Sequence, residues 1–170
     1  MLIFDDVGIA QESLHFANTK KMKTLILKLN LKKTYDRVNW NFLWMLLIQI
    51  GLKWEVAQWI MGYVSNTNYV VLVNGSPTCF FKGQRGLRKG YPLSTLLFLL
   101  VVEAFSRMLK TTCLEGKFSS LKVAKDFTLS HLLFVDDVLI LGIASFEEWT
   151  ILKKKLDMFC HASGMEVNYQ

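Results

Sequence analysis

Hydrophobic and polar positions along this chain predict short strands that alternate with amphipathic helices. Over residues 7–20 apolar side chains recur at helical spacing, which predicts a first helix. Over residues 24–29 leucines alternate with other residues, which predicts a strand that Asn30 ends. By the same reasoning we expect helices over 40–50, 54–64, 96–110 and 145–161, hairpins over 69–82 and 131–141, and short strands over 121–124 and 165–168.

Glycine, proline and capping residues mark the ends of several of these elements. Gly51 predicts the end of the helix before it. The Asn-Gly pair at 74–75 predicts a hairpin turn, and the Ser-Pro pair after it is expected to lengthen the loop. Pro92 and Ser94 are expected to precede and cap the helix that follows. Bulky residues of the second and third helices are expected in the core: Trp40, Trp44, Met45, Trp54, Trp59 and Met61.

The order of these elements predicts an α+β fold, with helices packed on one face of a small antiparallel sheet. The chain has 170 residues and no repeat or low-complexity linker, so we expect one domain. The apolar run at 96–102 is cut by Glu103 and is shorter than a bilayer span, so no membrane partner is expected. Acidic residues close to the amino terminus argue against a signal peptide.

Charge and cysteine content indicate what class of partner the chain can bind and what kind of compartment suits it. The formal net charge of +6 suits a polyanionic partner such as nucleic acid. Cys79, Cys113 and Cys160 form no CxxC pair, so the sequence indicates neither a zinc site nor a disulfide framework. A reducing compartment fits these thiols, and the sequence leaves open whether the intracellular location is nuclear or cytoplasmic. The oligomeric state is left open.

Asp136 and Asp137 lie between two apolar runs and are expected at the tip of a β-hairpin. Two adjacent like charges are costly unless a cation lies on them. Mg²⁺ is such a cation, because it takes a few carboxylates and fills its other positions with substrate phosphates and water. Aspartate is also an ordinary turn residue, so a plain turn remains the alternative.

Two further features can join the carboxylate pair. Asn30 ends the first strand, and adjacent strand ends can hold a two-metal phosphoryl-transfer centre with ions about 3.5–4 Å apart. Residues 83–92 form a basic loop in which glycines let backbone N–H groups approach phosphates and arginines supply charge. A solvated surface turn is the alternative for this loop.

Three motifs occur in order along the chain: Leu-Lys-Leu-Asn-x4-Tyr-Asp-Arg-Val-x-Trp at 27–40, Arg-Gly-Leu-Arg-Lys-Gly-Tyr-Pro-Leu-Ser at 85–94, and His-Leu-Leu-Phe-Val-Asp-Asp at 131–137. In this order and spacing they resemble the reverse transcriptase of LINE-type (non-LTR) retrotransposons, especially plant copies. The resemblance covers nearly the whole chain. It implies the palm of a right-hand polymerase over about 22–170 and part of the fingers over 1–21, without thumb or endonuclease.

The resemblance also implies an RNA-directed DNA polymerase, which uses an RNA template, a DNA primer, dNTPs and two Mg²⁺ ions. In that reaction the primer 3′-hydroxyl attacks the α-phosphate of a dNTP, and pyrophosphate leaves. By position, Asp136 and Asp137 match the metal-binding pair. Tyr35 matches the aromatic residue that packs under the sugar and rejects a 2′-hydroxyl. The basic loop is expected to meet the nucleotide and template through Lys89, Gly90 and Pro92, and backbone phosphates through Arg85 and Arg88.

The chain departs from the family pattern at the position of the third metal-binding aspartate, where it has Asn30. Asparagine is neutral and a poor partner for Mg²⁺ beside a triphosphate. Loss of roughly 4 kcal/mol of transition-state stabilisation slows the reaction about a thousandfold. Asp36 resembles a structural aspartate of the family and is not expected to substitute. The basic loop has Lys89, Tyr91 and Thr95 where Gln, Asp and Pro are usual. We therefore expect a nearly inactive polymerase.

Two other functions stay open. The chain can be a non-catalytic nucleic-acid-binding remnant that keeps a basic groove, in which case binding weakens with salt and no primer is extended. It can also be another palm-type enzyme such as a nucleotide cyclase, although Phe134 and Val135 stand where those enzymes carry glycines. His131, at the start of a strand, is expected to be a packed histidine rather than a ligand.

Overall fold

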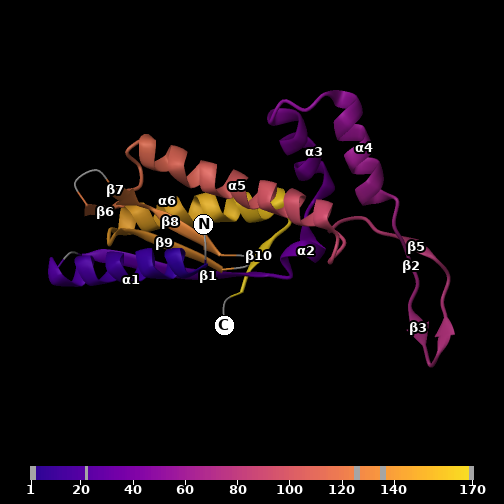
Figure 1. Ribbon diagram of the computed structural model, residues 1–170, viewed down its shortest axis with the longest axis horizontal. Helices are drawn as coiled ribbons and strands as arrows, with labels where there is room; N and C mark the ends of the chain where they lie inside the picture. The colour runs from indigo at the N-terminus through magenta and orange to yellow at the C-terminus, as the bar shows by residue number, and fades with distance from the viewer. Residues whose placement is uncertain (1–2, 22, 125–126, 135–136, 169–170) are drawn as a thin grey trace. The chain divides into compact units, whose positions relative to one another are not determined.

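The structure is a computed structural model that describes residues 3–21, 23–124, 127–134 and 137–168. It has the expected α+β architecture (Figure 1). The chain divides into two compact units. The first, here called the sheet unit, comprises Met1–Lys32, Val102–His161 and Glu166–Gln170. The second, here called the hairpin unit, comprises Lys33–Val101 and Ala162–Met165.

The sheet unit contains a four-stranded antiparallel sheet in the order β10-β1-β9-β8. These strands are β1 (Thr24–Lys32), β8 (His131–Phe134), β9 (Asp137–Ile143) and β10 (Glu166–Val167). Asn30 does not end the first strand, as the sequence suggested, because β1 continues to Lys32: β9 pairs with it up to Asn30, and β10 pairs with it at Leu31 and Lys32. Asn30 therefore lies within β1, directly opposite Asp137 of β9.

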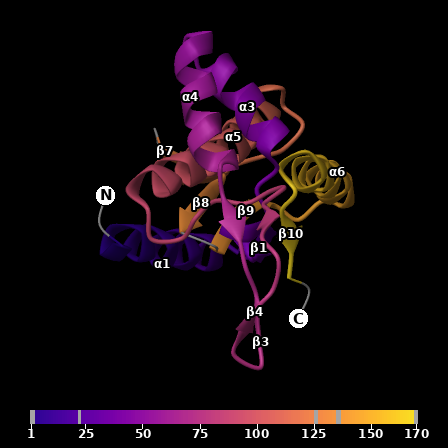
Figure 2. The same cartoon turned by 90° about the vertical axis from the view of Figure 1, so that its right-hand side faces the viewer.

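Helices cover both faces of this sheet, whereas the sequence predicted one covered face. Leu29 and Val138 are buried register partners on the face next to α6 (Phe146–Ser163), whose Leu152 and Leu156 line a pocket with Leu29. On the opposite face, α1 (Ile3–Thr19) packs through its apolar stripe. Its contacts join one buried cluster: Ile9, Leu14, Ala17, Leu132, Leu139 and Leu141. Both views place α1 and α6 on opposite sides of the strands (Figures 1 and 2).

The long helix α5 (Pro92–Leu114) begins four residues earlier than the predicted start at residue 96. Proline is favoured in the first turn of a helix, because backbone N–H groups in that turn have no acceptor within the helix. Ser94 consequently lies inside the helix and is buried, rather than capping it. The sequence predicted an apolar run too short to cross a membrane, but α5 is long and apolar enough to do so by length and composition alone. Within its most apolar 18 residues, 44% is buried inside the protein. A buried core helix has the same properties.

Two short strands, β6 (Leu121–Ala124) and β7 (Phe127–Leu129), pair next to α1 in the sheet unit. The first of them matches the predicted strand. Glu148, in the first turn of α6, accepts a hydrogen bond from the backbone N–H of Ser119 at 3.1 Å. This bond ties α6 to the segment that leads into β6.

The hairpin unit contains α2 (Thr34–Arg37), α3 (Trp40–Gln49) and α4 (Trp54–Ser65), close to the bounds predicted for the last two. The helices α3 and α4 lie side by side (Figure 1). The prediction that their large residues are all core is wrong. Trp54 is 60% exposed, Trp59 74% and Met45 63%.

A long hairpin follows α4, and it contains the Asn-Gly turn predicted at 74–75. Its strands are β2 (Asn68–Tyr69), β3 (Leu72–Val73), β4 (Ser76–Pro77) and β5 (Phe81–Lys82). Asn74 and Gly75 both have positive φ, 50° and 82°, as a two-residue hairpin turn requires. Because Val73 pairs directly with Ser76, the Ser-Pro pair belongs to a strand and does not lengthen the loop.

Candidate active site

Asn30 and Asp137, two of the residues predicted to meet, face each other across β1 and β9 in the sheet unit. The Nδ2 atom of Asn30 donates to Oδ1 of Asp137 at 3.0 Å. Lys28, two residues before Asn30 on the same face of β1, places its Nζ 3.3 Å from Oδ2 of Asp137. The hydrogen bond from Asn30, helped by Lys28, holds the pKa of the Asp137 carboxyl below its usual value. Asp137 is therefore an ionised carboxylate with a protein donor at each oxygen.

These described side chains do not fit the two-metal site that the resemblance implies. Mg²⁺ needs oxygen ligands and usually several carboxylates. Asp137 supplies one carboxylate, while Asn30 presents its NH2 group and Lys28 an ammonium. Among residues 3–21, 23–124, 127–134 and 137–168, no group of three or more His, Cys, Asp or Glu side chains is placed to hold a metal. Asp136 lies outside the described residues, so its role as a ligand remains a prediction.

The other predicted site residues lie in the hairpin unit, around the basic loop. Backbone hydrogen bonds join this loop to α2 and the residues after it: the N–H of Gly86 donates to the Val38 carbonyl at 2.8 Å, and the N–H of Leu87 donates to the Tyr35 carbonyl at 2.7 Å. The indole Nε1 of Trp40 donates to the Gly86 carbonyl at 2.7 Å. The Arg-Gly-Leu segment is thus held along α2.

Gly86 is required at this junction by both its conformation and its surroundings. Its φ of +89° is in the left-handed region that favours glycine. A Cβ atom on Gly86 would lie 2.8 Å from the carbonyl oxygen of Asp36. A larger residue would push the loop away from α2.

Tyr35 stacks on Phe98 of α5, with ring centroids 4.6 Å apart and an interplanar angle of 23°. Its backbone carbonyl also accepts the bond from Leu87. The ring plane is therefore fixed by packing, as a side chain that selects among sugars needs. Its predicted contact with the nucleotide sugar remains a prediction.

Arg88 and Lys89 are held by contacts within the chain. Arg88 donates from Nε to Oγ1 of Thr67 at 2.8 Å and from Nη2 to the Asn66 carbonyl at 3.2 Å. Its guanidinium also lies 6.0 Å from the ring centre of Tyr63 and 5.7 Å from that of Tyr91. The Nζ of Lys89 lies 3.1 Å from Oδ2 of Asp36. Of the three predicted cations, Arg85 alone makes neither an ion pair nor a side-chain hydrogen bond within the described residues.

The remaining predicted residues frame the end of the loop. Gly90 has a φ of +85° with open space where a Cβ would be. Glycine is therefore favoured at this position by the backbone conformation and not by close neighbours. Pro92 begins α5. Neither position bears a charged group, and their predicted contact with nucleotide and template stays a prediction.

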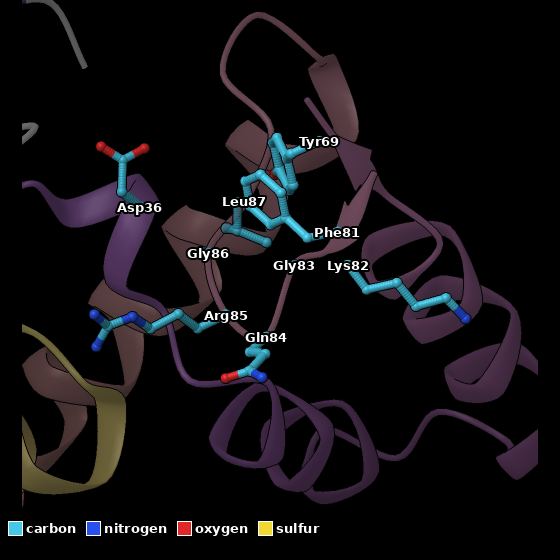
Figure 3. A pocket seen from close by; sticks show the side chains of 9 residues that line it. All are labelled: Asp36, Tyr69, Phe81, Lys82, Gly83, Gln84, Arg85, Gly86 and Leu87. Carbon is cyan, nitrogen blue, oxygen red and sulfur yellow. The ribbon is translucent and has the colours of Figure 1, made fainter. Parts of the chain in front are cut away.

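Next to the basic loop lies a pocket of about 560 Å³, which the sequence reasoning missed (Figure 3). Its walls come from loop residues 83–87, from Asp36 of α2 and from Tyr69, Phe81 and Lys82 of the hairpin. Tyr69 and Phe81 are cross-strand partners, with ring centroids 5.8 Å apart. The available signal was an aromatic residue in each hairpin strand close to the basic loop, where cross-strand pairing can bring the two together.

His131 is half-buried at the start of β8 and is a packed residue, as predicted. Its ring nitrogens lie 2.8 Å from Oγ of Ser130 and 2.9 Å from Oγ of Ser106. Burial, with a smaller contribution from Lys110, lowers the pKa of His131 to about 4. The ring is therefore neutral at neutral pH.

Solved structures similar to this chain include telomerases. Telomerase from Candida albicans, in complex with a fragment of telomeric RNA, has a TM-score of 0.70 at 14% identity, covering 99% of this chain and 30% of its own. Apo telomerase from Candida tropicalis has a TM-score of 0.65 at 15% identity, covering 99% of this chain and 31% of its own. At these identities the likeness shows the fold, which is the reverse transcriptase palm that the motifs implied.

Sequence relatives come from mobile elements and mitochondria. The transposon TX1 uncharacterized 149 kDa protein of Xenopus laevis is 30% identical over 108 residues, which are 64% of this chain and 8% of that protein. An uncharacterized mitochondrial protein of Arabidopsis thaliana is 35% identical over 79 residues, which are 45% of this chain and 65% of that protein. The matched part thus spans less than two thirds of either relative. Because the model of the reverse transcriptase (RNA-dependent DNA polymerase) family matches residues 2–170, the chain belongs to that family.

Proposed function

We propose that this chain is the polymerase domain of a retrotransposon-type reverse transcriptase that still binds primer–template nucleic acid but has lost most of its nucleotidyl transfer activity. One observation carries the proposal: the amide of Asn30 donates a hydrogen bond to the Asp137 carboxylate at 3.0 Å. In this arrangement β1 contributes a donor where the family reaction needs an anionic oxygen. Family membership leaves the nucleotide-cyclase alternative without support.

The electrostatics of the pair explain why activity is expected to fall. A second carboxylate at position 30 would repel Asp137 in the absence of a cation, and a divalent ion would relieve that repulsion. Asn30 removes this repulsion and so lowers the demand for a cation. Lys28 lowers that demand further, because its ammonium already lies 3.3 Å from Asp137.

Binding of nucleic acid does not depend on that pair. The net charge of +6 supports attraction to a polyanion. Arg85 makes no ion pair within the described part of the chain, so it is available for a phosphate. The Candida albicans telomerase neighbour is solved with an RNA fragment, which also supports a nucleic-acid partner.

Titration of Mn²⁺ into three purified chains tests the loss of the metal site. The chains are wild type, Asn30→Asp and the control Asn18→Asp, which adds the same charge at an exposed position of α1. We expect Asn30→Asp to bind the ion at least tenfold more tightly than the other two. Equal affinities in all three chains would contradict the role assigned to position 30.

A filter or anisotropy assay with an RNA–DNA primer–template tests the retained binding. The logarithm of the affinity is expected to fall linearly with the logarithm of the salt concentration, because bound phosphates release counterions. The same slope in wild type and Asn30→Asp would support a binding surface separate from the pair. Absence of any salt-dependent binding would refute this half of the proposal.

A further inference from the structure

The pocket beside the basic loop has the chemistry of a site for an unpaired nucleotide. Its volume of about 560 Å³ is typical of small-ligand pockets, which span about 300–1,000 Å³. Tyr69 is 42% exposed and Phe81 50%, so both rings offer a face to a ligand. Flat aromatic side chains bind single-stranded nucleic acid by stacking, because every base has a π-face.

The aromatic pair is held in place by its surroundings. Tyr69 and Phe81 are register partners of β2 and β5, and their rings stack with an interplanar angle of 28°. A Cβ atom on Gly83 would lie 3.0 Å from Cε2 of Tyr69 and 3.5 Å from the indole of Trp40. The glycine therefore allows the Tyr69 ring to rest on the loop, and the pair is ordered before a ligand arrives.

Two cationic side chains, Arg85 and Lys82, line the same pocket as the rings. Figure 3 shows Arg85 and Lys82 extending in opposite directions from the loop, with Tyr69 and Phe81 grouped above it. Neither cation forms an ion pair within the described residues. Residues 68–81 contain no charged side chain, and the carboxylate in the pocket wall, Asp36, is paired with Lys89 at 3.1 Å. A base stacked on the rings would leave its flanking phosphates free to approach these two cations.

We infer that Tyr69 and Phe81 form a stacking platform for one unpaired base of a single-stranded nucleic acid, with Arg85 and Lys82 beside its phosphates. The inference deepens the proposed function, because it assigns part of the nucleic-acid contact to named residues. The platform is expected to accept any base, because stacking on a ring face does not depend on the identity of the base.

The test compares two short strands of equal length, an oligouridylate and an abasic strand with the same phosphates. At low salt, wild type is expected to bind the oligouridylate more tightly than the abasic strand. Phe81→Leu keeps an apolar side chain of similar size but removes the ring. It is expected to weaken oligouridylate binding about five- to thirtyfold and to leave abasic binding unchanged.

A neighbouring aromatic residue supplies the control. Phe80 is 77% exposed and does not line the pocket, so Phe80→Leu removes an exposed ring from the same strand region. It is expected to keep the full preference for the oligouridylate. Far-ultraviolet circular dichroism of both variants checks that the hairpin unit remains folded.

The outcomes separate this inference from the proposed function. If wild type binds blunt primer–template duplex but binds both single strands equally, the platform is refuted and the proposed function stands. An equal loss of preference in Phe80→Leu and Phe81→Leu would also refute the platform. Failure of wild type to bind any nucleic acid would overturn both.

Discussion

Replacement of Gly86 by alanine should loosen the contact between the basic loop and α2. The change places a Cβ 2.8 Å from the Asp36 carbonyl oxygen in a residue with a φ of +89°. The left-handed conformation costs a non-glycine residue about 1–2 kcal/mol. Relief of the clash also strains the bonds that the backbone of Gly86 makes with Val38 and Trp40, each worth about 1 kcal/mol. We expect a total loss of about 2–4 kcal/mol in the free energy of unfolding.

Gly90 provides a matched control for this prediction. Its φ is +85°, but nothing lies within 4 Å of the position that a Cβ would occupy. Gly90→Ala should therefore lose only the backbone contribution of about 1–2 kcal/mol. Urea unfolding followed by tryptophan fluorescence measures both variants. Equal losses in Gly86→Ala and Gly90→Ala would refute the argument that the Asp36 carbonyl sets the requirement.

Two further predictions concern titratable groups. The pKa of His131 is lowered from 6.5 to about 4 by burial, so the unfolded chain gains a proton at a higher pH than the folded chain. The free energy of unfolding should fall by about 3 kcal/mol from pH 6.5 to pH 4, and His131→Gln should remove this part of the pH dependence in denaturant titrations. Exposed Cys79 should react with a thiol reagent before Cys113 and Cys160, whose pKa values burial raises. Mass spectrometry of partly modified protein locates the label, and first modification at Cys160 would contradict this order.

Much of the central pairing could be predicted from the sequence. Alternating leucines over β1 and the apolar runs around the aspartates required paired strands, and the register of β1 and β9 places Asn30 opposite Asp137. The partner order β10-β1-β9-β8 was not predicted in full, because alternation identifies strands but not their neighbours. The continuation of β1 past Asn30 depends on β10, which is only two residues long.

Exposure was harder to predict than pairing. Trp54 and Trp59 are large and apolar, which suggested the core, yet α4 buries only its Ala57 and Val64 face completely. A single-sequence pattern gives the period of an apolar stripe but not which neighbour covers it. The second covered face of the sheet was missed for the same reason, because α1 finds its partner in β8 and β9.

The contacts of individual cations could not be predicted from sequence either. Lys28 was assigned only to a strand, although its ammonium lies 3.3 Å from Asp137. Arg88 was expected to meet phosphates, and in the structure it binds Thr67 and the Asn66 carbonyl. Long flexible side chains contact residues that lie far away in the sequence, and the spacing of residues along the chain does not reveal these contacts.

Primer extension by wild type and Asn30→Asp tests the central claim most directly. Both chains are supplied with an RNA template, a DNA primer, dNTPs and Mn²⁺, with Asn18→Asp as the charge control. The account predicts that Asn30→Asp incorporates nucleotides about a thousandfold faster than wild type, which corresponds to about 4 kcal/mol of recovered transition-state stabilisation. Extension by wild type at the rate of Asn30→Asp would contradict it, because the amide at position 30 would then be no obstacle to nucleotidyl transfer.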